Sequence, residues 1–198
     1  MGEDIHQRIY LKHRKTGKYV NAHEICDWCP GEGSLFEELV PGRNYNLFSL
    51  FGSNRGEYAP LADAEYGMPD FLRDTVFDEY CMTIGYYGFT WFKLPKLSKS
   101  VKEYIKTLKD PLKYLDEDTD VHANWIELIS YVKAGKDGWY EKFTKSYEEW
   151  LEYHKNILSD LKRIDEILDR FVKIDEWCKV YNRIFDINET VFLFFFDN

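Results

Sequence analysis

The feature that most constrains the fold is a change in the spacing of apolar residues along the chain. Across residues 143–171 they recur at alternating intervals of four and three, a pattern typical of a helix packed along one seam. The two chain ends instead resemble β-strands, and residues 189–196 form a continuous apolar run of strand length. We therefore expect an α+β protein with a small mixed sheet built from both chain ends and a long α-helical hairpin insertion.

The sheet is expected to use four segments. Residues 5–11 and 18–22 flank a turn ending in Gly17, which predicts a β-hairpin. Residues 86–92 are rich in strand formers, and residues 189–196 predict a central strand buried on both faces. Short helices are expected over residues 45–51 and 69–80, the second because proline and acids suit a helix start.

The helical insertion is expected over residues 98–185, which leaves 1–97 plus 186–198 as the α+β core. Residues 100–103 (SVKE) read as a capping box that begins a helix, and Pro111 should break it. A second helix is expected from Asp120 to a stop at Gly135. The long helix, continued to about Phe185, would be roughly 65 Å long. The pattern leaves open an αα-hairpin, a coiled-coil-like arm and a homodimer through that arm.

Charge limits the classes of partner. The chain carries 26 Lys and Arg against 35 Asp and Glu, and neither half is basic, which disfavours binding of duplex nucleic acid. The negative charge either keeps the protein in solution or suits a basic partner. No apolar run approaches about 20 residues, and the first residues lack a signal-peptide pattern, so we expect a cytoplasmic protein without membrane contact.

Motifs for chemistry are sparse. Cys26 and Cys29, with His23 nearby, could ligate zinc or form a redox pair, but no fourth ligand has standard spacing, and plain loop cysteines are the simpler reading. Residues 52–56 form a polar turn without the pattern of a P-loop. His154 lies at a seam position, where a hydrogen-bonded interior histidine is expected. We therefore predict no catalytic residue, no metal and no cofactor, and lean against an enzyme.

Four motifs in this order resemble a family of small uncharacterised tailed-phage proteins. They are GRNYNLF at 42–48, GMP at 67–69, FTWFKL at 89–94 and VFLFFFDN at 191–198. The sequence departs from the family pattern at Met68, where leucine is usual, and at Phe195, where tryptophan is usual. The resemblance covers residues 1–96 and 186–198, and it implies a phage accessory protein without an assigned activity.

If the resemblance holds, polar and amphipathic residues inside these otherwise apolar motifs and the nearby turn become candidate ligand-binding residues. Arginine and aromatic planes suit a nucleotide-like ligand, through charge on phosphate and stacking on a base. The competing interpretation is structural, with Arg43 paired to Asp197 and Trp91 buried. The candidates are Arg43, Tyr45, Arg55, Trp91 and Asp197.

The leading functional hypothesis is a non-enzymatic phage accessory protein of the host cytoplasm that inhibits an antiviral defence by binding. It would either capture a small nucleotide-like signal or occlude a host defence protein. The alternative is an acidic inhibitor or adaptor that acts through the helical arm, whose residues 148–169 are rich in Asp and Glu. A third hypothesis is an enzyme that degrades a small signalling molecule.

Overall fold

The computed structural model describes residues 5–22, 39–40, 45–52, 60–108, 140–173 and 183–197. The chain divides into two compact units, one of residues 1–101 with 164–198 and one of residues 102–163. The first unit contains a sheet formed by the N-terminal and C-terminal segments. The predicted boundaries of the α+β core, at 97/98 and 185/186, stay a prediction, and the two compact units divide at other residues.

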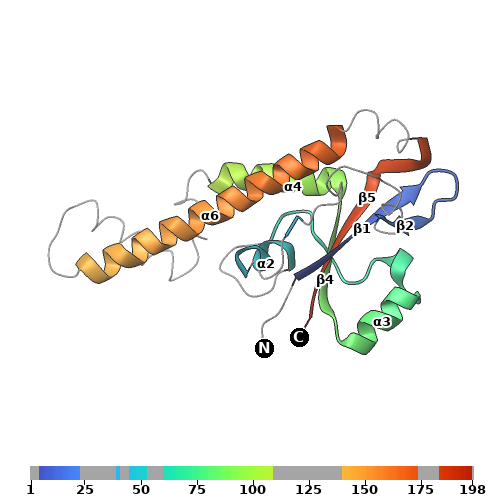
Figure 1. Cartoon of the computed structure of the whole chain (residues 1–198), viewed down its shortest axis with the longest axis horizontal. Coiled ribbons are helices and arrows are strands. Elements are labelled where there is room, and N and C mark those ends of the chain that lie inside the picture. Colours follow the sequence, from blue (N-terminus) through green and yellow to red (C-terminus); the bar gives the residue numbers. More distant parts are fainter. Residues whose placement is uncertain are drawn as a thin grey trace, which may run out of the picture. The chain divides into compact units, whose positions relative to one another are not determined.

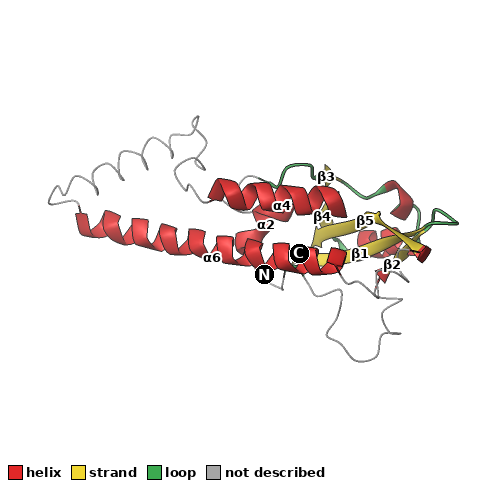
Figure 2. Ribbon diagram, turned by 90° about the horizontal axis from the view of Figure 1, so that it is seen from above, coloured by secondary structure: helices red, strands yellow, loops and turns green. Residues whose placement is uncertain are grey.

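Five strands form one sheet in the order β2-β1-β5-β4-β3. Every neighbouring pair is antiparallel, so the expectation of a mixed sheet is wrong. A continuous apolar run does not fix strand direction, because an antiparallel strand covered on both faces has the same composition. Figure 2 shows β1, β5 and β4 side by side. The strands are β1 (Ile5–His13), β2 (Tyr19–Asn21), β3 (Glu65–Tyr66), β4 (Tyr87–Lys93) and β5 (Phe185–Phe196).

The prediction of a central, doubly buried C-terminal strand is confirmed. β5 pairs with β1 on one side and β4 on the other, and its residues 190–196 are all buried. The strand begins at Phe185, opposite His13, directly after the helical residues 183–184; residues 174–182 lie outside the described part, so the continuation of the long helix to about Phe185 stays a prediction. The predicted hairpin is also confirmed, since β1 pairs with β2 and Gly17 between them has a φ of +68°.

One face of the sheet, the helical face, carries Phe192, Phe194 and Phe196 of β5. The helix α2 (Tyr45–Gly52), predicted from sequence, packs here, with the Phe51 ring centroid 4.6 Å from that of Phe194 and Phe48 5.3 Å from Phe196. The last turns of α6 (Tyr140–Lys173) lie on the same face through Phe171, 5.8 Å from Phe192. These three phenylalanines, at every second position, therefore contact helices from distant parts of the chain. The colours of Figure 1 show how far apart α2 and α6 lie in the sequence.

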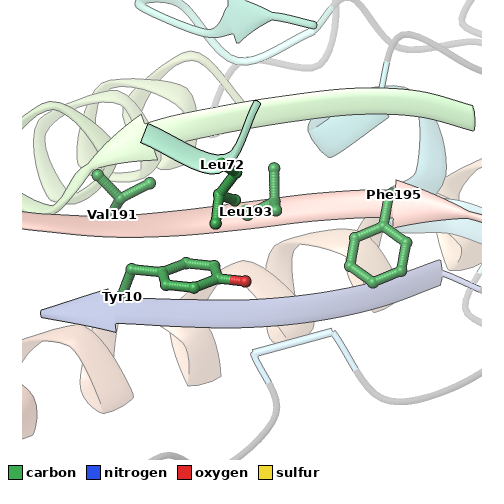
Figure 3. Packing of buried hydrophobic residues seen from close by; sticks show 5 residues of the cluster. All are labelled: Tyr10, Leu72, Val191, Leu193 and Phe195. Atoms are coloured by element: carbon green, nitrogen blue, oxygen red, sulfur yellow. The ribbon is translucent and has the colours of Figure 1, made fainter. Parts of the chain in front are cut away.

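The opposite face, the aromatic face, carries Val191, Leu193 and Phe195. These side chains form a buried cluster with Tyr10 of β1 and Leu72 (Figure 3). A single 3₁₀ turn, η1 (Asp70–Leu72), and the helix α3 (Val76–Ile84) pack on this face. One helix had been expected over residues 69–80. It is interrupted because Asp74 has a φ of +57°, outside helical geometry, and α3 starts anew with Thr75 as its N-cap.

Two glycines make room for the ring of Phe196. A Cβ on Gly88 would lie 2.8 Å from Phe196 Cδ2, and a Cβ on Gly52 would overlap the same ring more severely. Gly88 also has a φ of +66°, a conformation that other residues rarely adopt. Glycine at both positions lets β4 and α2 approach the end of β5 closely.

The helix α4 (Leu94–Leu108) begins directly after β4 rather than at the predicted capping box, so that prediction is wrong. Pro95 occupies its first turn, where a missing backbone donor costs little. Ser100 is buried within the helix, and its hydroxyl donates to the carbonyl of Ala62 at 2.5 Å. The Ser100 hydroxyl, which fits the sequence pattern of a helix cap, thus bonds to the backbone of Ala62 instead of capping α4.

The helix α6 contains 34 residues and is about 50 Å long. His154 is buried, and its Nε2 lies 3.1 Å from the carbonyl oxygen of Leu108, which confirms the expected interior histidine. Because a carbonyl only accepts, Nε2 must carry the proton. The expected break at Pro111 and the helix from Asp120 to Gly135 lie outside the described residues, so the helical hairpin stays a prediction.

Candidate ligand-binding face of the sheet

Of the five residues predicted to bind a ligand, two have described side chains. Trp91 lies on β4, opposite Leu193, and is partly buried on the aromatic face. Asp197 follows the end of β5. Tyr45 is the first residue of α2, and its side chain lies outside the described part, as do Arg43 and Arg55.

The structure does not bring Trp91 and Asp197 together. Asp197 lies four residues beyond Leu193, which places it about 13 Å along the strand from the position of Trp91. Its Oδ2 is 3.2 Å from Nε2 of His6, and the His6 ring stacks on Phe195 with centroids 5.3 Å apart. Asp197 therefore pairs the C-terminal segment with β1, and the two residues do not form one site.

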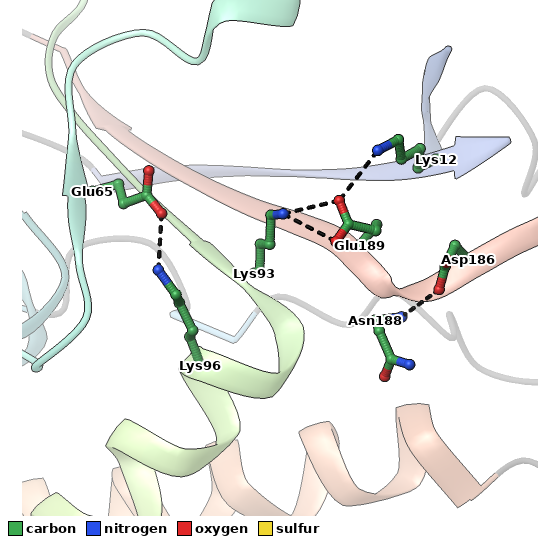
Figure 4. Close-up of polar contacts among 7 residues, drawn as sticks. All are labelled: Lys12, Glu65, Lys93, Lys96, Asp186, Asn188 and Glu189. Carbon is green, nitrogen blue, oxygen red and sulfur yellow. Dashed lines mark hydrogen bonds and ion pairs between the residues drawn. The ribbon is translucent and has the colours of Figure 1, made fainter. Parts of the chain in front are cut away.

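A charged cluster lies near Trp91 on the same face, and we name Lys12, Lys93 and Glu189 the lysine–glutamate cluster (Figure 4). Lys93 Nζ is 3.0 Å from Oε1 and 2.9 Å from Oε2 of Glu189. Lys12 Nζ is 3.3 Å from Oε2 of the same carboxylate. One carboxylate thus holds two ammonium groups from the strands on either side of β5, and all three side chains are partly exposed.

A bulge in β5 contains Glu189, whose carboxylate lies between the two lysines. Tyr10 pairs with Val191 and Lys12 with Asp186, so four residues of β5 span the place of one residue of β1. The Asp186 side chain accepts a hydrogen bond from the backbone N–H of Asn188 at 3.2 Å, which closes a turn within the bulge. Bulges of this kind redirect side chains and are common next to binding sites.

The charges of the cluster stabilise one another. Hydrogen bonding from Lys93 lowers the pKa of Glu189 below its ordinary value, with a smaller contribution from Lys12, although burial acts in the opposite direction. The same hydrogen bond raises the pKa of Lys93 against the effect of burial. Both shifts favour the charged forms of Glu189 and Lys93, and the formal charges of the cluster sum to +1 in a protein of formal net charge -9.

Aromatic rings border the cluster. Tyr19 of β2 stacks on Phe71 with ring centroids 3.8 Å apart, and Lys12 Nζ lies 5.7 Å above the Tyr19 ring. Burial raises the pKa of Tyr19, and the Glu189 carboxylate adds to the effect, while Lys12 lowers it. Trp91 is two residues before Lys93 on β4, so both side chains lie on the same face. Cations and aromatic planes are therefore neighbours on this surface.

A second pair lies at the edge of the same region, where Lys96 Nζ is 3.1 Å from Glu65 Oε1 (Figure 4). Glu65 is paired with Trp91 across the β3–β4 ladder. Trp91 therefore has the Lys96–Glu65 ion pair on the side of β3. The lysine–glutamate cluster begins two residues further along β4, at Lys93.

The described residues offer little for other chemistry. Within them, no group of three or more His, Cys, Asp or Glu side chains is arranged to hold a metal ion. His23, Cys26 and Cys29 lie outside the described part, so the zinc hypothesis is untested. Cys81 is buried, and burial raises the pKa of its thiol to about 11, which disfavours a reactive thiolate. Among the described helices, none combines the length and apolarity needed to span a bilayer.

Sequence reasoning missed the lysine–glutamate cluster. Lys12 and Lys93 stand at every-second-residue positions from Tyr10 and Trp91, so each strand carries a charge at a predictable place on one face. Glu189 stands at the start of the apolar run of β5, as Asp197 stands at its end. The missing signal was the pairing of β5 with both β1 and β4, because only this register brings the three side chains together.

Comparison of the chain with protein-family models, with curated proteins and with solved structures finds no match.

Proposed function

We propose that this protein acts by stoichiometric binding and that the lysine–glutamate cluster with Trp91 receives a nucleotide-derived anion. The observation that carries the proposal is the position of Glu189, in a bulge, between two lysines on a partly exposed sheet face bordered by aromatic rings. Phosphate groups would take over hydrogen bonds that Glu189 now accepts, and a base would stack on the indole.

The exchange is physically reasonable because the cluster is partly exposed. A fully buried ion triad would lose several kcal/mol if its carboxylate were displaced, whereas exposed pairs are each worth about 0–1 kcal/mol. A phosphate dianion brings more charge and more acceptor oxygens than a carboxylate. Glu189 would then act as a placeholder that keeps the two ammonium groups apart and charged until the ligand arrives.

The biological role is proposed from the sequence resemblance. The four motifs by which the sequence resembles small tailed-phage proteins include residues 89–94 and 191–198, which overlap the strands β4 and β5 that carry the proposed site. We propose a phage accessory protein that inhibits a host antiviral defence by sequestering a nucleotide signal. Sequestration needs no catalytic group, which fits a site made of cations and rings.

The proposal is tested with purified full-length protein, cyclic nucleotides, cyclic dinucleotides and ADP-ribose derivatives. Isothermal titration calorimetry measures binding, and mass spectrometry of the ligand released by denaturation shows whether it is intact. The site is supported if Lys93→Met weakens binding and Lys162→Met leaves it unchanged. Lys162→Met is the control, because Lys162 is an exposed lysine on α6. Recovery of a converted ligand would establish an enzyme, and the absence of binding would remove the proposal.

The alternative of an acidic arm that engages a partner protein gains less support from the described part of α6. Over residues 152–172 the helix carries five acids and four bases, and its exposed positions include Lys155, Lys162 and Arg170 beside Glu152 and Glu166. A surface of mixed charge favours solubility more than steering toward a basic partner.

A further inference from the structure

The outer face of α3 exposes apolar side chains in a regular row. Val76, Tyr80 and Ile84 are four residues apart, so they lie along one side of the helix, and they are 83%, 47% and 51% exposed. Met82, on the same helix, is 78% exposed. Single exposed apolar residues need no explanation, but an aligned row of them on one short helix marks an interaction surface.

The exposure is not the result of a frayed helix. Thr75 caps the first turn by accepting a hydrogen bond from Asp78 N–H, and Gly85 ends the helix with a φ of +84°. The inner side is fixed by Cys81, which is fully buried, and by Phe77. The Phe77 ring packs against Phe195 and lies 4.2 Å beneath the guanidinium carbon of Arg8. The outer row is therefore held rigidly in solvent.

The segment that carries this row is acidic. Between residues 70 and 84 the acids Asp70, Asp74, Asp78 and Glu79 outnumber the single base Arg73, and Arg73 is paired with Asp70 at 3.2 Å. We propose that the outer face of α3 is a docking site for a basic amphipathic helix of a partner protein. Apolar side chains of that helix would cover Val76, Tyr80 and Ile84, and its Lys or Arg residues would meet the acids at the rim.

The same charges disfavour the other occupants of an apolar helix face. A second copy of this chain packed on α3 would bring two like-charged rims together, which costs free energy. An anionic lipid surface would be repelled for the same reason. The proposal concerns a surface different from the lysine–glutamate cluster and does not depend on the ligand proposed there.

The test uses synthetic peptides and the full chain. The probe is a fluorescent helical peptide of Leu and Lys with an apolar stripe, and its controls are the same composition in scrambled order and the same pattern with Glu in place of Lys. Fluorescence anisotropy gives the affinity for the wild type, for V76S/I84S, for D70N/E79Q and for the controls V172S and E166Q. Val172 and Glu166 are an exposed apolar residue and an exposed acid on α6, so these controls remove the same chemistry elsewhere.

The expected result is binding of the patterned basic peptide that V76S/I84S and D70N/E79Q each weaken by about tenfold, while both control variants bind like the wild type. Equal affinity across all variants would show that the peptide does not bind the outer face of α3, and it would overturn the proposal. So would equal binding of the scrambled peptide. If the wild type sediments as a dimer and V76S/I84S as a monomer, the surface binds a second copy of the chain instead. If the wild type binds neutral phosphatidylcholine vesicles, the surface binds lipid instead. Circular dichroism shows whether each variant stays folded.

Discussion

Lys93 of β4 reaches across to Glu189 of β5 and contacts both of its carboxylate oxygens, at 2.9 and 3.0 Å. Lys12 reaches the same carboxylate from β1, so one acid connects the three central strands. The cluster lies where β1 and β4 end, and the aromatic rings of Tyr19 and Trp91 lie beside it on the same face. The proposed binding function and its tests follow from that arrangement.

Glu189→Gln is expected to lower the free energy of unfolding by about 1 kcal/mol, because two ion pairs are lost and the lysines face each other without an intervening charge. The pKa of Glu189 is lowered in the folded protein, so its contribution is present above the ordinary value of 4.5 and lost as the pH falls through the lower folded-state value. Urea unfolding at neutral and acidic pH measures this. The wild type and E189Q should converge in acid, and a constant difference at all pH values would contradict the account.

Gly88→Ala is expected to destabilise the protein by about 3 kcal/mol, from a strained backbone and from overlap with Phe196. Gly17→Ala is a matched control, since Gly17 also has a positive φ but a Cβ there meets nothing within 4 Å. G17A should therefore cost only about 1 kcal/mol. Thermal unfolding of both variants measures the difference. If the two alanines cost the same, the close approach of β4 to Phe196 is not part of the fold.

The sheet shows how far sequence reasoning reached. The run at 189–196 and the hairpin around Gly17 identified strands correctly, because apolar content and turn chemistry are local properties. Strand direction and the β5 bulge were missed, because they depend on pairing between residues up to 191 positions apart, as between Ile5 and Phe196. The start of α4 was misplaced because Ser100 has a helix-capping pattern but satisfies its hydroxyl at Ala62, a contact that only the tertiary structure supplies.

The candidate site was predicted less well than the fold. Trp91 was a candidate for ligand binding, which stays a prediction, and the structure places Lys93 and Glu65 rather than Asp197 beside it on the sheet. Asp197 was chosen because it is a polar residue beside an apolar motif, but in the structure it pairs with His6. A charged residue at the end of a strand can be assigned to a site only when the strand register shows which other charged residues lie on the same face.

His154→Gln is expected to make stability less dependent on pH. Burial lowers the pKa of His154, with the carbonyl of Leu108 acting in the opposite direction, so the folded protein favours the neutral ring. The stabilisation is complete above the ordinary pKa of 6.5 and is lost as the pH falls through the folded-state value. Each unit of lowering corresponds to about 1.4 kcal/mol. Urea unfolding from about pH 7.5 to about pH 5 should show a steeper loss in the wild type than in H154Q. Parallel curves would mean that the histidine is not buried as described.

Thr75→Ala is expected to lower the free energy of unfolding by about 1 kcal/mol, because the side chain caps α3 and also donates to the carbonyl of Leu72 at 2.6 Å. Thr83→Ala, on the exposed side of the same helix, should change stability by less than about 0.5 kcal/mol. Denaturant unfolding compares the two. A larger effect of T83A would show that the cap does not hold α3 in place.

The most direct test of the binding proposal is a calorimetric titration of the wild type, K93M and E189Q with the nucleotide ligand found in the screen. The account predicts one ligand per chain, at least tenfold weaker binding to K93M and tighter binding to E189Q. The tightening follows because removing a negative charge about 4 Å from the ligand is worth about 1 kcal/mol, or fivefold, even in water-like surroundings. Equal affinities in all three proteins, or weaker binding to E189Q than to the wild type, would contradict the placement of the ligand on the lysine–glutamate cluster.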